Sequence, residues 1–225
     1  MLHKVLYSYA GIATQILIQD PHFIILLDSG DGIIRDLLEE NVVFPLTVPL
    51  YIFLSHGHYD HCGGLFSLLG FLRMLGQTSP VRIYYPAGSN EIKGLVNLFK
   101  SSYSDTIPFE LKMCDLQPQT EIAITKEVRV VAYEMRHMGS TRSHGMLPEI
   151  PAFGYAIFKG SEKWLAYTGD TGINENLPIL LEDASHAYIE ATNLSAQHSE
   201  YHLNKEEAIE LGRLTKNFTL VHTRK

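Results

Sequence analysis

The sequence has few cysteines and no long apolar run. Cys62 and Cys114 are the only 2 cysteines among 225 residues, which is too few for a disulfide framework, so a reducing compartment is expected. The N-terminal residues show no signal-peptide pattern. No apolar stretch reaches the length of about 18 residues that a membrane-spanning helix needs. These absences predict a cytoplasmic protein that does not cross a membrane.

Basic residues are also in short supply. The chain has 18 lysines and arginines against 25 acidic residues, a net charge of -7. Such a balance disfavours long contacts with a polyanion, although bound metal ions would make a site locally positive. The hydrophobic fraction of 45% is ordinary for a globular protein, and a chain of this length can bury a substantial core. With no linker or repeat in sight, residues 1–225 are expected to form a single domain.

Apolar runs and turn signals predict an α/β fold. Alternating or continuous apolar runs indicate strands at 14–18, 23–27, 50–54, 81–85, 109–113, 121–124, 128–135, 153–158, 163–167, 186–189 and 218–221. Helical spacing indicates helices at 33–38, 65–75, 90–99, 175–181 and 205–216, and loops are expected at 101–105 and 137–151. Asn204 and Glu207 form a capping pair before the last helix. This order fits two sheets packed between helical layers.

Three imidazoles and one carboxylate lie within the segment His56-Gly57-His58-Tyr59-Asp60-His61. The segment follows an expected buried strand and precedes an expected helix. Imidazole suits zinc, iron, copper and nickel, and a carboxylate adds a hard oxygen ligand. His56 and His58 can face one ion, while Asp60 and His61 stand where a second could be held. A histidine-rich surface loop is the alternative, but the number of ligands and their context favour a metal site.

Further histidines and carboxylates stand at the ends of expected strands. They are Asp28, His137, Asp170, His202 and His222. Strand ends along one sheet edge converge, so these residues can share a site with the first cluster. Two ions about 3.5–4 Å apart can hold one hydroxide and clamp the charge that develops in an in-line displacement. Asp170 can bridge two ions because a carboxylate has two oxygens, with an ordinary turn aspartate as the alternative.

The order of several motifs along the chain is informative about its family. They are Asp28-Ser29-Gly30-Asp31-Gly32, the His-Gly-His-Tyr-Asp-His turn, a later histidine, Thr168-Gly169-Asp170-Thr171 and Leu220-Val221-His222. This order resembles the metallo-β-lactamase superfamily. Within it the chain looks most like the tRNase Z (ribonuclease Z) branch, through Tyr84-Tyr85-Pro86-Ala87-Gly88, Glu190-Ala191-Thr192 and His202-Leu203-Asn204. The resemblance implies a four-layer αββα sandwich and a hydrolase with two divalent ions. Zinc is the expected metal, with manganese or iron as alternatives.

The resemblance also implies a role for each candidate residue. One ion would be held by His56, His58 and a histidine of the 137–144 loop. The other would be held by Asp60, His61 and His222, with Asp170 bridging the two. Asp60 would also steer the attacking hydroxide as a base.

Glu190 and His202 match the family's carboxylate–imidazole pair, which protonates the leaving oxygen. An imidazole held by a carboxylate is a good general acid near neutral pH. A strand-end salt bridge with a surface histidine is the alternative interpretation of this pair.

The third histidine ligand has two candidates. His137 directly follows the strand expected before it, where the family's ligand stands. His144 lies closer to Ala152-Phe153-Gly154-Tyr155, another landmark of the family. His137 requires fewer insertions and is preferred.

Three departures from the tRNase Z pattern bear on the substrate. The turn 159–163 is too short to be that branch's basic tRNA-binding arm. The family's His-Glu-Ala-Thr is Ile189-Glu190-Ala191-Thr192 here, and its His-Ser-Thr is His202-Leu203-Asn204. Together with the net charge, these departures predict a phosphodiesterase in which a bridging hydroxide attacks a small nucleotide, such as a cyclic nucleotide or a short oligonucleotide. A tRNA substrate is disfavoured, and a homodimer is left open.

Other functions remain as alternatives. One is a tRNA 3′-processing endoribonuclease that acts as a dimer, and another is a metal-dependent lactone or thioester hydrolase. A metal-binding module without catalysis is a third. The loop 138–151, with Arg142 inside it, is a candidate lid or anion-binding segment, and a plain surface loop is the alternative.

Overall fold

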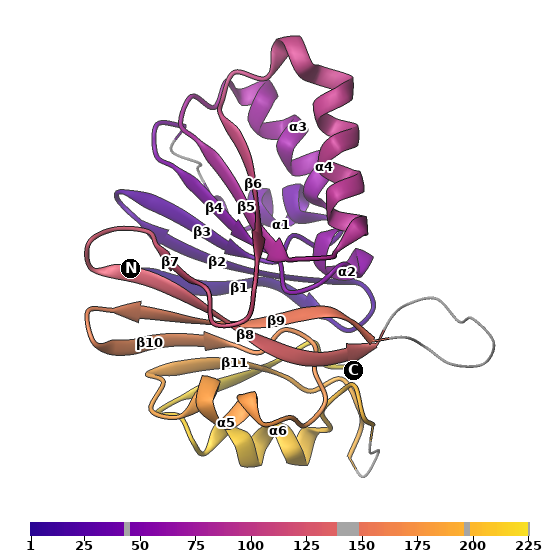
Figure 1. The fold of residues 1–225 in the computed structure, drawn as a ribbon, viewed down its shortest axis with the longest axis vertical. Coiled ribbons are helices and arrows are strands. Elements are labelled where there is room, and N and C mark those ends of the chain that lie inside the picture. The colour runs from indigo at the N-terminus through magenta and orange to yellow at the C-terminus, as the bar shows by residue number, and fades with distance from the viewer. Residues whose placement is uncertain (43–45, 139–148, 196–198, 225) are drawn as a thin grey trace, which may run out of the picture. The chain divides into compact units, whose positions relative to one another are not determined.

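The computed structural model describes residues 1–42, 46–138, 149–195 and 199–224. The chain divides into two units, Met1–Asp115 and Leu116–Lys225. Each unit contains one six-stranded sheet and its own helices (Figure 1). The expectation of a single domain over 1–225 stays a prediction.

The first unit is a mixed sheet in the order β1-β2-β3-β4-β5-β6. Its strands are β1 (Leu2–Tyr9), β2 (Ala13–Asp20), β3 (Phe23–Leu27), β4 (Leu50–Phe53), β5 (Val81–Pro86) and β6 (Leu111–Leu116). The pairs β1–β2 and β2–β3 are antiparallel, whereas β3–β4 and β4–β5 are parallel. Every residue of β3 and β4 is buried, which explains why these strands read as continuous apolar runs.

The helices of the first unit pack through one apolar face. They are α1 (Ile33–Glu39), α2 (Tyr59–Cys62), α3 (Leu65–Leu75), α4 (Asn90–Tyr103) and a 3-10 turn, η1 (Ser104–Thr106). In α3 the buried residues are Leu65, Leu68, Leu69 and Leu72, the spacing of one helical face. They share a core with Ile52 of β4 and other sheet residues. The helix ends at Gly76, whose φ of 74° is left-handed.

The second unit is a mixed sheet in the order β12-β11-β10-β9-β8-β7. Its elements are β7 (Glu121–Ala123), β8 (Val128–Met138), β9 (Glu149–Lys159), β10 (Glu162–Tyr167), α5 (Asn176–Leu181), β11 (His186–Glu190), α6 (Lys205–Gly212) and β12 (Phe218–Val221). Ala156, Ala166 and Ala187 lie side by side on β9, β10 and β11. They share a core with leucines of α5, such as Leu177 and Leu180, and their small size lets the helix pack close to the sheet.

Parallel strands bring the candidate ligands to common sheet edges within each unit. In the first unit β3 leads into Asp28 and β4 leads into Ser55 and His56. In the second unit β10, β11 and β12 are parallel, and their C-terminal ends lead to Asp170, Thr192 and His222. Binding sites of open parallel sheets form at such ends.

Most expected elements are present. No bounds were expected for β1, α2 or η1, and the other misses concern the ends of elements. Residues 101–103 were expected as a loop but continue α4, because Tyr103 packs against Phe99 at a ring distance of 5.1 Å. The last helix was expected to reach 216 but ends at Gly212, where the chain turns back and packs closely on Phe218 at the start of β12.

The loop expected at 137–151 is shorter than predicted. His137 and Met138 continue β8 and pair with Ile150 and Glu149 of β9. Pairing with β9 therefore extends β8 beyond the end that its own residues predict. The rest of that loop, with Arg142 and His144, lies outside the described residues. Over the part of the chain that the structure covers, no helix is long and apolar enough to cross a membrane.

Candidate functional site

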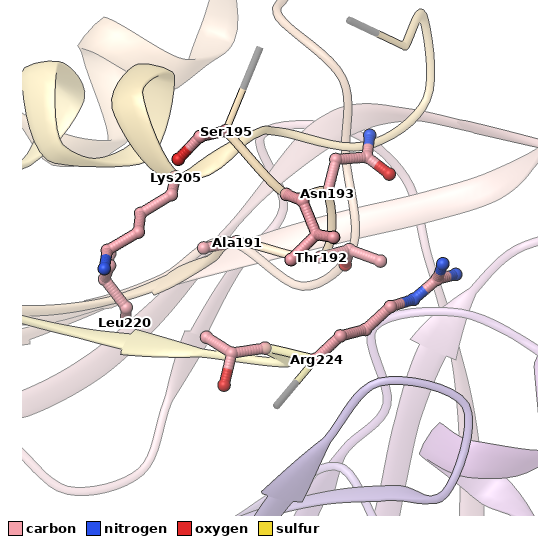
Figure 2. Close-up of a pocket in the computed structure, with 9 residues that line it drawn as sticks. Ala191, Thr192, Asn193, Ser195, Lys205, Leu220 and Arg224 are labelled. Carbon is pink, nitrogen blue, oxygen red and sulfur yellow. The ribbon is translucent and has the colours of Figure 1, made fainter. Parts of the chain in front are cut away.

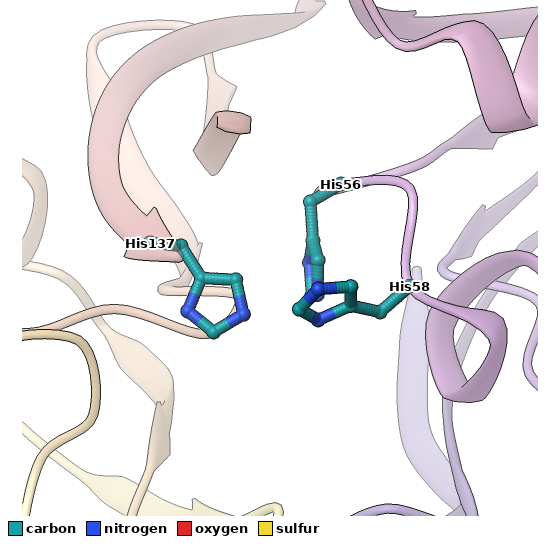
Figure 3. Close-up of side chains that lie close together, drawn as sticks. All are labelled: His56, His58 and His137. Carbon is teal, nitrogen blue, oxygen red and sulfur yellow. The ribbon is translucent and has the colours of Figure 1, made fainter. Parts of the chain in front are cut away.

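The first unit contributes two histidines from a loop and two ligands from a one-turn helix. His56 and His58 follow β4, and Asp60 and His61 lie in α2. The His56 ring lies 4.6 Å from the His58 ring and 4.2 Å from the His61 ring, centroid to centroid. Figure 3 shows His56 and His58 extending toward each other from one loop. The turn predicted from sequence therefore gathers its imidazoles on one side.

Asp28 fixes the orientation of His61. It is fully buried, and its Oδ2 accepts a hydrogen bond from His61 Nδ1 at 2.7 Å. Ser55 donates to the same carboxylate through its backbone N–H at 2.6 Å and its hydroxyl at 2.8 Å. The Ser55 oxygen in turn accepts from His56 Nδ1 at 2.9 Å. With Nδ1 as donor in both rings, Nε2 carries the lone pair that a metal ligand needs.

Glycines allow the Asp28 loop to lie directly against α2. A Cβ on Gly30 would overlap the Asp60 carbonyl oxygen, and one on Gly64 would overlap the Gly30 carbonyl oxygen. Ser29 N–H donates to the His61 carbonyl at 2.7 Å. Asp28 itself has a φ of 61°, which aspartate tolerates better than most residues. This tight packing places the carboxylate of Asp28 at the Nδ1 edge of the His61 ring.

Asp60 is oriented by the turn between β1 and β2. Gly11 N–H donates to Asp60 Oδ2 at 3.0 Å. Cys62, two residues on, is buried, and burial raises the pKa of its thiol to about 12. It donates to the Gly57 carbonyl and acts as a packing residue. In α2, Asp60 is thus the residue that can offer an oxygen ligand to a metal ion.

The second unit contributes a further set of donors. The ligand atoms of His137, Asp170 and His202 lie within 4.8 Å of one another, as do those of Glu190, His202 and His222. His137 stands at the end of β8, as Figure 3 also shows. Asp170, Glu190 and His222 come from the ends of three adjacent parallel strands. The structure therefore brings together the candidate ligands and the candidate acid among the described residues of this unit.

Hydrogen bonds orient the histidines of the second unit as well. His137 Nδ1 donates to the Tyr201 carbonyl at 3.0 Å. His222 Nδ1 donates to Thr192 Oγ1 at 2.7 Å, and that hydroxyl donates to Glu190 Oε2 at 2.8 Å. Both rings keep the Nε2 lone pair for a ligand, as His56 and His61 do.

Glu190 and His202 form the expected pair. His202 Nδ1 donates to Glu190 Oε1 at 3.0 Å, and backbone N–H groups of Thr171 and Leu203 donate to the same oxygen. Glu190 is fully buried, while His202 is partly exposed. The carboxylate is held by the backbone, so it can hold His202 in one orientation. A structural salt bridge would show the same contact, so the catalytic role stays a prediction.

A pocket lies next to this pair in the second unit. It has a volume of about 410 Å³, and Figure 2 shows Lys205 and Arg224 on opposite sides of it. Its lining residues are Ala191, Thr192, Asn193, Leu194, Ser195, Lys205, Leu220, Thr223 and Arg224. Thr192 belongs both to the pocket wall and to the hydrogen bonds of Glu190 and His222. The pocket combines positive charge, hydroxyls and a small apolar floor.

The donors of both units fit divalent metal ions. Imidazole nitrogens with a fixed tautomer, together with carboxylate oxygens, form the ligand set that zinc and related ions prefer. Second-layer carboxylates, hydroxyls and carbonyls that hold the other ring nitrogen are typical of such sites. Within the described residues, the sequence-predicted ligands therefore have the environment of metal ligands.

Sequence reasoning missed the residues that orient the ligands. Asp28 was expected to share the site and Thr192 was recognised as part of a motif, but their roles as acceptors for His61 and His222 did not follow from the sequence. Their signal was available: each is a polar residue just after a buried strand. The Tyr201 carbonyl and the Gly11 N–H carry no side-chain signal and could not have been found.

Comparisons with known proteins agree with this geometry. A family model described as "Beta-lactamase superfamily domain" matches residues 25–223. Ribonuclease Z of Pyrococcus horikoshii is 31% identical over 140 residues, which are 62% of this chain and 40% of that relative. The match thus spans about two fifths of that relative's length.

Two solved structures have a similar fold. Human tRNase Z, short form, superposes with a TM-score of 0.79 at 19% identity, over 99% of this chain and 93% of the other. A diphosphatase from the PhnP family gives 0.70 at 16% identity, over 99% and 86%. At such identities the likeness concerns the fold, and it confirms the predicted α/β class with two mixed sheets and flanking helices.

Proposed function

This chain belongs to the beta-lactamase superfamily, and we propose that it is a phosphodiesterase that works with two divalent ions on a small nucleotide. The predicted family, fold type and enzyme class, a metal-dependent hydrolase resembling ribonuclease Z, are confirmed at the level of the family. The substrate, the metal and the role of each residue are the proposal.

The ligands of the two units together would form one centre. His56, His58 and His137 would hold one ion, and Asp60, His61 and His222 the other, with Asp170 between them. The observation that carries this assignment is the shared orientation of four of these imidazoles, in which Nδ1 is held and Nε2 stays available to an ion. Nδ1 is held by Ser55 in His56, by Asp28 in His61, by Tyr201 in His137 and by Thr192 in His222.

The chain's own groups then have distinct tasks. Bound divalent ions would polarise the phosphate and lower the pKa of water. Asp60 and Asp170 offer carboxylate oxygens, and Asp60 can also accept a proton from the attacking water. His202, held by Glu190, would donate a proton from Nε2 to the leaving oxygen. Zinc suits this imidazole-rich set, with manganese and iron as alternatives.

A small anionic substrate fits the charge and the pocket. A net charge of -7 disfavours a long polyanion. The β9–β10 connection is a short turn, with Lys159 paired to Glu162, and leaves no room for a tRNA-gripping arm. The 410 Å³ pocket beside Glu190 is within the range of small-ligand sites, and Lys205 and Arg224 supply charge for a phosphate.

A second candidate is a tRNA 3′-processing nuclease acting as a homodimer, which the ribonuclease Z relative favours. For either candidate function we propose that the protein resides in the cytoplasm, which its two free cysteines support. Cleavage of precursor tRNA in preference to cyclic nucleotides and dinucleotides would decide for this candidate.

The test uses two leaving groups on the metal-loaded protein. p-Nitrophenolate leaves without a proton, whereas a nucleoside alkoxide needs one. His202→Ala should therefore lower kcat on a dinucleotide or cyclic nucleotide by about 10²–10⁴-fold and change the hydrolysis of bis-p-nitrophenyl phosphate much less. His22→Ala, an exposed histidine in the β2–β3 turn, is the control.

Two outcomes would contradict the proposal. Equal losses on both substrates would show that His202 is no general acid. Hydrolysis of lactones or thioesters by the wild-type protein, without hydrolysis of any phosphodiester, would assign a different reaction to the same centre.

A further inference from the structure

Tyr59 is the exposed residue of the ligand-bearing helix. In α2 the other residues, Asp60, His61 and Cys62, are buried, whereas Tyr59 is 63% exposed. It therefore contributes little to the core of its unit. In sequence it stands between His58 and Asp60, two proposed ligands, so its Cα lies about 3.8 Å from the Cα of each.

The ring of Tyr59 is held in place by the turn between β1 and β2. Its hydroxyl donates to the Gly11 carbonyl, and Gly11 N–H donates to Asp60 Oδ2 at 3.0 Å. Gly11 has a φ of 73°, a conformation that glycine adopts without strain. Because both peptide groups of the turn are tied to α2, the aromatic side chain is fixed before any ligand binds.

The turn that holds this ring also carries an exposed apolar side chain. Ile12, the next residue of the same turn, is 44% exposed. A rigid aromatic ring presents its face at a low cost in conformational entropy, since little motion is lost on binding. Nucleobases stack on such faces without needing a particular hydrogen-bond pattern.

We propose that Tyr59 is a specificity-determining residue whose ring stacks on the nucleobase of the substrate. This inference rests on the proposed function and narrows its substrate to phosphodiesters that carry a planar base next to the scissile phosphate. The ions would bind the phosphate, and Tyr59 would distinguish a nucleotide from a phosphodiester of an aliphatic alcohol.

The test measures binding and does not depend on turnover. AMP and ribose 5-phosphate carry the same phosphate and sugar and differ only in the base. By calorimetry on the metal-loaded protein, the wild type should bind AMP about tenfold more tightly than ribose 5-phosphate. Tyr59→Leu keeps apolar bulk but removes the aromatic face, so it should abolish this preference and leave the affinity for ribose 5-phosphate unchanged.

Two further variants serve as controls. Tyr59→Phe keeps the ring and loses only the bond to Gly11, so it should retain most of the preference for AMP. Leu98→Ala removes an exposed apolar side chain from α4, far along the chain, and should change neither affinity. Circular dichroism checks that each variant is folded.

Equal affinity of the wild type for the two phosphates would overturn the inference, and so would a preference for AMP that survives in Tyr59→Leu. In both cases hydrolysis of phosphodiesters would leave the proposed function standing. Absence of binding by both phosphates, together with absence of phosphodiester hydrolysis, would overturn the proposed function and the stacking with it.

Discussion

Single buried residues decide which nitrogen each candidate ligand presents. Asp28 accepts from His61 Nδ1, and Thr192 plays the same part for His222. A histidine whose Nδ1 lacked an acceptor could rotate or change tautomer, and its lone pair would then point elsewhere. The partner residues should therefore contribute to metal affinity alongside the ligands themselves.

Asp28→Asn tests whether the acceptor at His61 Nδ1 contributes to metal affinity. Asparagine keeps the shape of the side chain but has only one acceptor oxygen, while His61, Ser55 N–H and the Ser55 hydroxyl all donate here. We expect divalent-metal affinity to fall about 10–100-fold, as found when outer partners of metal ligands are replaced. Competition with a chromogenic chelator measures the affinity.

Asp31→Asn is the matched control, since Asp31 is exposed in the same loop. It loses the same charge without losing a contact to a histidine. If both variants bound metal as weakly as each other, loss of negative charge rather than orientation of His61 would explain the effect.

At the scale of elements, α6 holds the candidate acid in place from its N-terminus. His202 and Leu203 directly precede Asn204, the N-cap residue. Asn204 Oδ1 accepts from Glu207 N–H at 2.9 Å, and Glu207 Oε2 accepts from Asn204 N–H at 2.9 Å. This capping box was predicted from the sequence and is confirmed.

Removing the cap should lower stability measurably. Asn204→Ala removes the acceptor of the Glu207 N–H in the first turn of α6, at a cost of about 1 kcal/mol. For a chain of this size that corresponds to a fall in Tm of about 2–4 °C. Lys205→Ala, at the exposed first residue of α6, should melt like the wild type; a Tm equally low in this variant would argue against the cap.

At the scale of the whole molecule, the proposed centre draws its ligands from both units. Metal binding should therefore stabilise the folded chain: at an ion concentration of 100 times Kd, binding contributes about 2.7 kcal/mol. The melting temperature should rise by about 5–10 °C with zinc and fall back with a chelator. Differential scanning calorimetry measures both changes.

Variants of His58 and His137 show whether one ion is shared. If both residues bind the same ion, His58→Ala, His137→Ala and the double variant should lose the same part of the metal-dependent stabilisation. Losses that add up in the double variant would mean that the two residues bind different ions.

The sequence by itself determined the ligand types, the family and most of the elements. Histidine and aspartate at His56–His61 are read directly, and β3, α3 and β12 have the predicted bounds, because apolar periodicity and glycine stops are local signals. The ends of α4, α6 and β8 were missed because packing and strand pairing with distant segments set them.

Only the tertiary structure decided which groups hold the imidazoles of His61, His222 and His137. Asp28 lies 33 residues from His61, Thr192 lies 30 from His222, and the Tyr201 carbonyl lies 64 from His137. The choice of His137 over His144 stays a prediction, since His144 lies outside the described residues. Hydrogen bonds over such separations depend on the register of parallel strands and on close packing at glycines, and no local pattern in the chain encodes them.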